Sequence, residues 1–103
     1  MKNLLLLTFV FTSGLLVSQG GKVIDQLSLK SKILDSERKY AVYLPIDYDH
    51  SNREYPVLYL LHGAGDDHTG WIQFGEVKSI ADKTNKEGLS TSMIIVMPDA
   101  QTG

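Results

Sequence analysis

The chain has 103 residues, 43% hydrophobic and 21% charged, which is the composition of a globular protein and not of a disordered or collagen-like one. Ten Lys and Arg residues against twelve Asp and Glu residues give a formal net charge of −2, so no basic field favours nucleic acid as a partner. The sequence contains no cysteine, which excludes disulfides, zinc–thiolate sites and cysteine nucleophiles within these residues.

The N-terminal segment has the layout of a secretory signal peptide. A short positive head at residues 1–3 precedes the apolar run LLLLTFVFTSGLLV at 4–17, and residues 18–21 supply small side chains for cleavage. As a transmembrane anchor the run is too short to cross about 30 Å of hydrocarbon, and a start at the first residue without a cap argues against a buried helix. We therefore predict a signal peptide over residues 1–20, a folded part over 21–103, and a secreted or periplasmic product that does not contact the membrane after cleavage.

Two strands are predicted next, over residues 26–34 and 39–44, where apolar side chains alternate with polar ones. The polar segment 35–37 (Asp-Ser-Glu) is the predicted turn between them, so the two strands should form an antiparallel hairpin. Pro45 ends the second strand, and the stretch 46–55 is rich in Asp, Asn and Ser, which indicates a surface loop.

The second half of the sequence predicts a βαβ unit. The segments PVLYLL at 56–61 and SMIIVM at 92–97 lack polar alternation, which is typical of parallel strands covered on both faces. The segment between them has apolar positions at helical spacing, namely Val77, Ile80, Ala81 and Thr84. This spacing predicts an amphipathic helix over 75–87, with Gly88 as the residue that ends it. The predicted fold class is therefore α/β, with an antiparallel hairpin at the edge of a sheet that becomes parallel and a right-handed crossover.

The predicted sheet has more apolar surface than one helix can cover. Each of the two parallel strands needs a cover on both faces, and only one face has a partner in the sequence. We interpret the chain as the N-terminal portion of a larger α/β domain. The alternative is a complete domain that covers its bare face by dimerising.

The segment His62-Gly63-Ala64-Gly65 follows the first parallel strand directly. Ligands of open parallel sheets bind beyond the carboxyl ends of the strands, so this segment lies where a ligand is expected. Small residues let the backbone turn sharply and leave amide N–H groups uncovered. Two such amides that point at a developing oxyanion stabilise the tetrahedral intermediate of acyl transfer.

Several segments resemble the N-terminal half of an esterase family of α/β-hydrolases: YAVYLP at 40–45, YPVLYLLHGAG at 55–65, the pair Gly70-Trp71, and IIVMPDA at 94–100. The family includes feruloyl and acetyl-xylan esterases of carbohydrate esterase family 1, S-formylglutathione hydrolases and mycolyltransferases. The resemblance implies an incomplete α/β-hydrolase sheet and hydrolysis of carboxylic esters by a serine nucleophile. It implies neither a metal nor an organic cofactor.

The resemblance also implies functions for individual residues. It places the first oxyanion-hole amide on Ala64, with Gly65 as the neighbour that opens the turn. His62 resembles a structural histidine that braces the loop together with Gly63, and it is not the catalytic base.

The residues after the turn have more than one interpretation. In the family pattern Trp71 and Asp67 border the substrate pocket, whereas Trp71 also fits a simple core position and the stretch 66–68 also fits a solvated loop. His62 and the segment Asp66-Asp67-His68 could instead ligate a metal ion. Their spacing is not that of a zinc-binding helix, and His50 is the only distal candidate ligand, so we predict no metal.

The serine nucleophile of this family lies in a G-x-S-x-G motif on a strand-to-helix turn, and the sequence contains no such motif. The nearest segment, GLSTS at 88–92, ends in serine and lies on a helix-to-strand connection. Because the triad of this fold runs Ser, Asp or Glu, then His, after the strand at 92–97, all three members are expected beyond Gly103. The 103-residue chain is therefore predicted to be inactive alone.

These observations together predict an exported serine esterase that acts on acylated polysaccharide or related esters. The signal peptide disfavours an S-formylglutathione hydrolase, whose glutathione-linked chemistry is cytosolic. Two alternatives stay open: a non-catalytic remnant of an esterase, and a carbohydrate-binding module, which would be a complete β-sandwich with aromatic side chains along one face.

Overall fold

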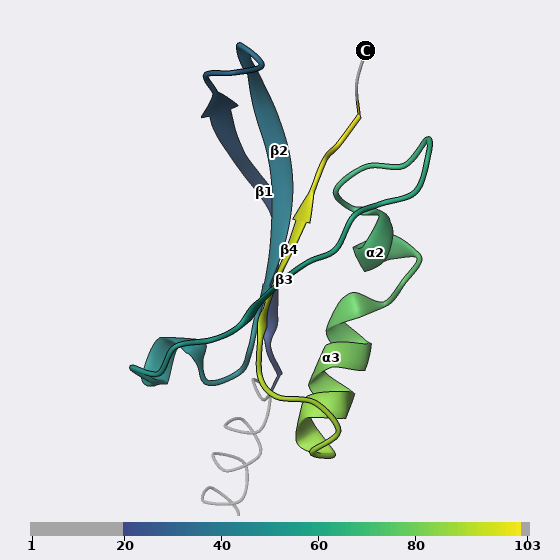
Figure 1. Ribbon diagram of the computed structural model, residues 1–103. Coiled ribbons are helices and arrows are strands. Elements are labelled where there is room, and N and C mark those ends of the chain that lie inside the picture. The colour runs from purple at the N-terminus through teal and green to yellow at the C-terminus, as the bar shows by residue number, and fades with distance from the viewer. Residues whose placement is uncertain (1–19, 102–103) are drawn as a thin grey trace, which may run out of the picture.

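The computed structural model describes residues 20–101, so residues 1–19 of the predicted signal peptide lie outside the described part of the chain. A mixed four-stranded sheet runs through these residues with its helices on one side (Figure 1). Its elements are β1 (Lys22–Ser31), β2 (Ser36–Leu44), the 3₁₀ turn η1 (Tyr48–His50), β3 (Val57–Tyr59), α2 (Gly70–Gln73), α3 (Val77–Lys86) and β4 (Ile94–Pro98). Between residues 20 and 101, no helix combines the length and the apolar character that a membrane crossing requires.

The predicted hairpin is present, but its bounds differ from those expected. β1 begins at Lys22, opposite Leu44, and a register shift between Ile24 and Leu27 interrupts the alternation of side chains that would have indicated this early start. The turn occupies residues 32–35 instead of 35–37, because Ser31 already pairs with Ser36.

The sheet order is β1-β2-β4-β3, which confirms the predicted α/β class. β4 pairs antiparallel with β2 and parallel with β3, so the hairpin continues into a parallel unit as expected. β3 is shorter than the predicted 56–61, although the Leu60 N–H still donates to the Val96 carbonyl at 2.9 Å. β4 begins at Ile94 rather than 92, since the Ser92 hydroxyl is bonded to the Asn85 side chain at 3.0 Å and holds that connection to α3.

The predicted helix is present as α3, and its C-terminus follows from Gly88. This glycine has a φ of +72°, and its N–H donates to the Asn85 carbonyl, while the Leu89 N–H donates to the Thr84 carbonyl. These two bonds form a Schellman motif, as the position of the glycine predicted. The helix begins at Val77 rather than 75 because Glu76 adopts a left-handed φ of 50°.

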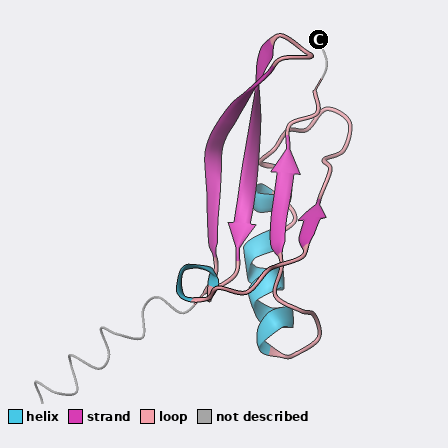
Figure 2. Ribbon diagram, turned by 60° about the vertical axis from the view of Figure 1, so that its left-hand side comes forward, coloured by secondary structure: helices cyan, strands magenta, loops and turns pink. Residues whose placement is uncertain are grey.

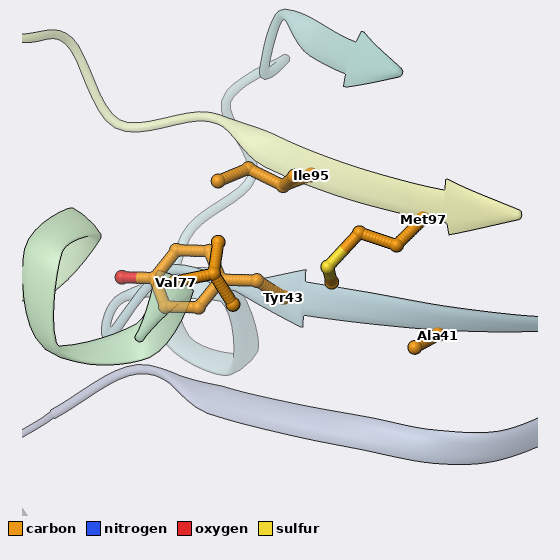
Figure 3. Packing of buried hydrophobic residues seen from close by; sticks show 5 residues of the cluster. All are labelled: Ala41, Tyr43, Val77, Ile95 and Met97. Carbon is orange, nitrogen blue, oxygen red and sulfur yellow. The ribbon is translucent and has the colours of Figure 1, made fainter. Parts of the chain in front are cut away.

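Both helices lie on the same face of the sheet (Figure 2). The core is formed where they meet the two central strands, and its members are Ala41, Tyr43, Val77, Ile95 and Met97 (Figure 3). The short helix α2 was not predicted, because a single turn is too brief to show a helical period.

The opposite face of the sheet is apolar, and neither helix covers it. Val57 and Tyr59 of β3 point to that face, since they pair in register with Ile94 and Val96, and they are 45% and 68% exposed. This matches the expectation that one face of the parallel strands has no partner in the sequence. A four-stranded sheet with helices on one face also differs from the β-sandwich of a carbohydrate-binding module.

A carboxylate on α3 ties the first described residues to the core. Asp82 accepts hydrogen bonds from the Tyr43 hydroxyl at 2.7 Å, from the Gly21 N–H at 2.9 Å and from Lys78 Nζ at 2.7 Å. A Cβ on Gly21 would lie 2.6 Å from the Leu44 carbonyl oxygen, and one on Gly20 would lie 2.7 Å from the Asp82 carboxylate. The two glycines therefore allow the chain to pass close to Asp82.

These contacts set the pKa values of the pair. Burial, then the hydrogen bond and the negative charge of Asp82, raise the pKa of Tyr43 above its ordinary value of 10.0. Partial burial alone would raise the pKa of Asp82, but the bonds from Lys78, Tyr43 and Gly21 together lower it below its ordinary value of 3.8. The lowered pKa of Asp82 stabilises the fold at pH values above 3.8, and this stabilisation is lost as the pH falls through the lowered pKa. The raised pKa of Tyr43 stabilises the fold at pH values below 10, and this stabilisation is lost progressively as the pH rises above 10.

We expect Tyr43→Phe to lower the free energy of unfolding of the full chain by about 1 kcal/mol at neutral pH, since one bond to a partly exposed carboxylate is lost. The difference between wild type and variant should shrink above pH 10 and again at pH values below the ordinary pKa of Asp82. Urea denaturation across pH measures it, with Tyr59→Phe, an exposed tyrosine, as the control. A difference that does not vary with pH would contradict the assignment.

Candidate active site

The loop that follows β3 lies at the end of the sheet where β4 also ends (Figure 1). Because β3 and β4 are parallel neighbours, their carboxyl ends meet at one edge. The loop from residue 60 to residue 69 and the segment 99–101 therefore lie next to one another, and hydrogen bonds connect them.

The candidate oxyanion-binding residues form a tight exposed turn. The Asp66 N–H donates to the Gly63 carbonyl at 3.1 Å, and Gly65 has a φ of +81°, which makes Gly63–Asp66 a type II turn with Ala64 at its second position. Ala64 and Gly65 are exposed, and their N–H groups have no acceptor among residues 20–101. A Cβ on Gly63 would meet no atom within 4 Å, so packing does not demand glycine there.

His62 connects the turn to the end of β4. The Ala100 N–H donates to His62 Nε2 at 2.9 Å, and Nδ1 lies 2.7 Å from the Gly63 carbonyl oxygen. Since Nε2 accepts a backbone N–H, the proton of the neutral ring must be on Nδ1, from where it is donated to Gly63. The side chain is 7% exposed. Both ring nitrogens are thus engaged by backbone groups, which is the geometry of a bracing side chain.

Trp71 holds the same loop from the side of α2. Its indole N–H donates to the Leu61 carbonyl at 2.8 Å, and the residue is 38% exposed. A Cβ on Gly75 would lie 2.6 Å from the indole ring, so this glycine allows the chain to pass the tryptophan closely. The indole therefore has a fixed position and leaves part of its surface accessible.

The two aspartates after the turn form local contacts. Asp67 Oδ1 accepts hydrogen bonds from the backbone N–H of Thr69 at 2.8 Å and from its hydroxyl at 2.6 Å. The hydroxyl bond, followed by the backbone bond, lowers the pKa of Asp67. Asp66 Oδ1 accepts the Asp67 N–H at 2.9 Å, and its carboxylate lies directly against the buried Gly70. Both carboxylates thus order the segment that leads into α2.

The two histidines of the alternative metal site bond to different parts of the backbone. His68 Nε2 lies 3.2 Å from the Asp25 carbonyl of β1, whereas His62 contacts Ala100. In the part of the chain that the structure describes, no three His, Asp or Glu side chains gather as metal ligands.

Sequence analysis missed the residues that hold the segment 99–101. Arg38 Nη2 donates to the carbonyls of Asp99 and Gln101 at 2.9 and 2.8 Å, and the Gln101 side-chain amide donates to the Asp66 carbonyl. Asp99 and Ala100 belong to the segment IIVMPDA that was singled out in the sequence, whereas Arg38 is more than sixty positions away from its acceptors and no local pattern connects them.

The chain is similar to known esterases in sequence and in structure. The family model described as "Putative esterase" matches residues 31–103. An endo-1,4-beta-xylanase/feruloyl esterase from Xylanibacter ruminicola is 33% identical over 78 residues, which is 72% of this chain and 11% of the relative.

Solved structures give the same result. A ferulic acid esterase is 39% identical with a TM-score of 0.77, over 82% of this chain and 32% of that chain. A ferulic acid esterase of carbohydrate esterase family 1 from Anaeromyces mucronatus, solved in complex with ferulic acid, is 38% identical with a TM-score of 0.64, over 77% of this chain and 28% of that chain. The chain thus spans about a third or less of the proteins that it matches.

Replacement of Thr69 by valine should raise the pKa of Asp67 toward its ordinary value of 3.8, because the hydroxyl bond that stabilises the carboxylate is lost while the backbone bond persists. A carboxyl-carbon NMR titration of the full chain measures this pKa. Thr84→Val, whose hydroxyl bonds to helix carbonyls instead, is the control and should leave it unchanged. An unchanged Asp67 pKa in Thr69→Val would contradict the contact.

Proposed function

The chain belongs to the esterase family of α/β-hydrolases, and from this premise we propose that it carries the oxyanion-binding turn of an exported enzyme that hydrolyses carboxylic esters. The observation that supports this most is the exposed type II turn at Gly63–Asp66. It offers the N–H of Ala64 beyond the carboxyl end of a parallel strand, without an acceptor among the described residues.

In the proposed reaction a serine hydroxyl attacks the ester carbonyl, and a histidine takes the hydroxyl proton and later gives it to the leaving alcohol. Negative charge develops on the carbonyl oxygen, and the Ala64 N–H donates to it. A second N–H, from the residue after the nucleophile, completes the oxyanion hole in this fold. Gly65 supplies the positive φ that the turn requires. This chemistry needs no metal and no organic cofactor.

We propose that the nucleophile, acid and base belong to sequence beyond these 103 residues. The sequence contains no G-x-S-x-G motif, and the match covers about a third or less of each of the matched esterases. Ala64 therefore represents one half of a site whose reacting groups lie elsewhere in the protein. The 103-residue chain alone is proposed to be inactive, and a non-catalytic remnant is the second candidate, because the same missing motif favours it.

The proposed substrates are esters of aromatic acids on plant polysaccharide. The support is that the named relatives are feruloyl esterases and that one similar structure contains ferulic acid. The part of Trp71 that stays exposed is proposed to face the acyl group, with Asp67 at the same rim. Their observed hydrogen bonds are bracing contacts, so binding by either residue stays a prediction. The apolar segment at 4–17 supports the proposal of a secreted or periplasmic enzyme.

The full chain should show no enzymatic turnover of p-nitrophenyl acetate above the rate of the heat-denatured chain, because it contains no G-x-S-x-G motif. Turnover above the rate of the heat-denatured chain would contradict the proposed location of the triad. Sequencing the DNA beyond codon 103 in all three frames separates the two candidates. A G-x-S-x-G motif after an apolar run, within a few tens of codons, supports the esterase, and a genuine stop without the motif supports the remnant.

In a longer protein that contains this chain and the proposed nucleophile, acid and base, Ala64→Pro should reduce kcat by about a hundredfold to a thousandfold with little change in KM. The reason is that proline removes one N–H donor of the oxyanion hole. Proline fits the second position of a type II turn, so the backbone can keep its path. Ala64→Gly, which retains the N–H, is the matched control and should keep most of the activity. Equal activity of the proline and glycine variants would exclude Ala64 as a donor.

A further inference from the structure

We propose that Arg38 is a positioning residue for the turn that holds Ala64, and that it acts through the segment 99–101 and His62. The effect on catalysis rests on the proposed function, whereas the positioning itself rests only on the contacts described here.

Arg38 lies on β2 and fixes the backbone after β4. One nitrogen, Nη2, donates to the carbonyls of Asp99 and Gln101, at 2.9 and 2.8 Å. No carboxylate among residues 20–101 forms an ion pair with Arg38, so its charge strengthens the two bonds to carbonyl groups. The Asp99 N–H also donates to the Lys39 carbonyl at 2.9 Å, which continues the pairing of β2 with β4 up to this point.

The segment held by Arg38 contacts the turn on both of its sides. The Ala100 N–H donates to Nε2 of His62, the residue before the turn. The Gln101 side-chain amide donates to the carbonyl of Asp66, the last residue of the turn. Because Ala64 lies between these two attachment points, the segment 99–101 determines where its N–H lies.

The contact with Ala100 also selects the tautomer of His62. As long as Ala100 donates to Nε2, the ring proton must be on Nδ1, where it is donated to the Gly63 carbonyl at 2.7 Å. A competing acceptor is close, since Asp99 Oδ1 lies 3.6 Å from Nε2, but that oxygen accepts the Gln101 N–H at 2.9 Å. Without Arg38, the carbonyls of Asp99 and Gln101 lose their shared donor and the segment beyond Asp99 can shift, so that Nε2 can carry the proton and donate to Asp99 instead.

A displaced turn weakens catalysis because an oxyanion-hole donor must lie about 3 Å from the oxyanion. Small misplacements caused by residues away from the reacting atoms reduce rates strongly. In a protein that carries the nucleophile, loss of Arg38 should therefore reduce kcat and leave KM nearly unchanged.

The test is the tautomer of His62 in the full chain, measured by two-bond ¹H–¹⁵N correlation at a pH where the ring is neutral and assigned with His62→Gln. Wild type should show the proton on Nδ1. Arg38→Met should shift the population toward Nε2–H and accelerate exchange of the Ala100 amide at least tenfold. Arg38→Lys should largely retain the wild-type pattern, because one ammonium nitrogen can donate both bonds. Lys39→Met, which removes an exposed positive charge from the same strand, should have no effect.

An Nε2–H tautomer in wild type, or a wild-type pattern in Arg38→Met, would overturn the proposal. So would an Arg38→Met variant that also loses protection of the amides between β2 and β4, because the role of Arg38 would then be general stability. This readout is independent of esterase activity. A second outcome is that the tautomer shifts as expected while a longer protein that contains this chain and a G-x-S-x-G motif does not hydrolyse esters. In that case the proposed function fails and the positioning role of Arg38 persists.

Discussion

The contact between His62 and the Ala100 N–H joins two strand ends into one site. Parallel pairing of β3 with β4 brings these ends to the same edge of the sheet, but pairing alone does not fix the loops beyond it. The imidazole supplies the connection, since one ring nitrogen receives a backbone N–H from the β4 side and the other donates to the turn. The exposed amides of that turn depend on this connection for their direction.

The turn at Gly63–Asp66 is held by side chains on both sides of it, which leave its central N–H groups exposed. The Trp71 indole bonds to the backbone before the turn, the Asp67 carboxylate bonds to Thr69 after it, and the Gln101 side chain contacts its last residue. Catalytic donors need support of this kind, because a loop with uncovered N–H groups would otherwise turn them toward any nearby carbonyl. These contacts hold the turn that we propose as the oxyanion-binding element of the esterase.

The sequence predicted those elements that can be recognised from neighbouring residues alone. The α/β class, the parallel unit and the glycine end of α3 followed from apolar runs and from one glycine after a helical period. The bulge in β1 hid the first residues of that strand, and α2 is too short to be recognised. The position of the turn was predictable because it follows an apolar run and consists of small residues, whereas the support from Arg38 depends on pairing between distant strands and was not.

The hydrogen bonds to Asp82 place a second requirement on residues 20 and 21, in addition to that of the proposed signal peptide. A signal peptidase needs small residues close to its cleavage point, and Gly20 and Gly21 meet that need in the proposed leader. A Cβ on Gly21 would lie 2.6 Å from the Leu44 carbonyl oxygen and from the Tyr43 hydroxyl, whereas one on Gly20 would meet only the ends of the Lys78 and Asp82 side chains, which can move. A bulkier residue at position 21 would thus disturb the start of β1 and, if the proposed signal peptide is cleaved nearby, its cleavage as well, so a purification tag is better placed elsewhere.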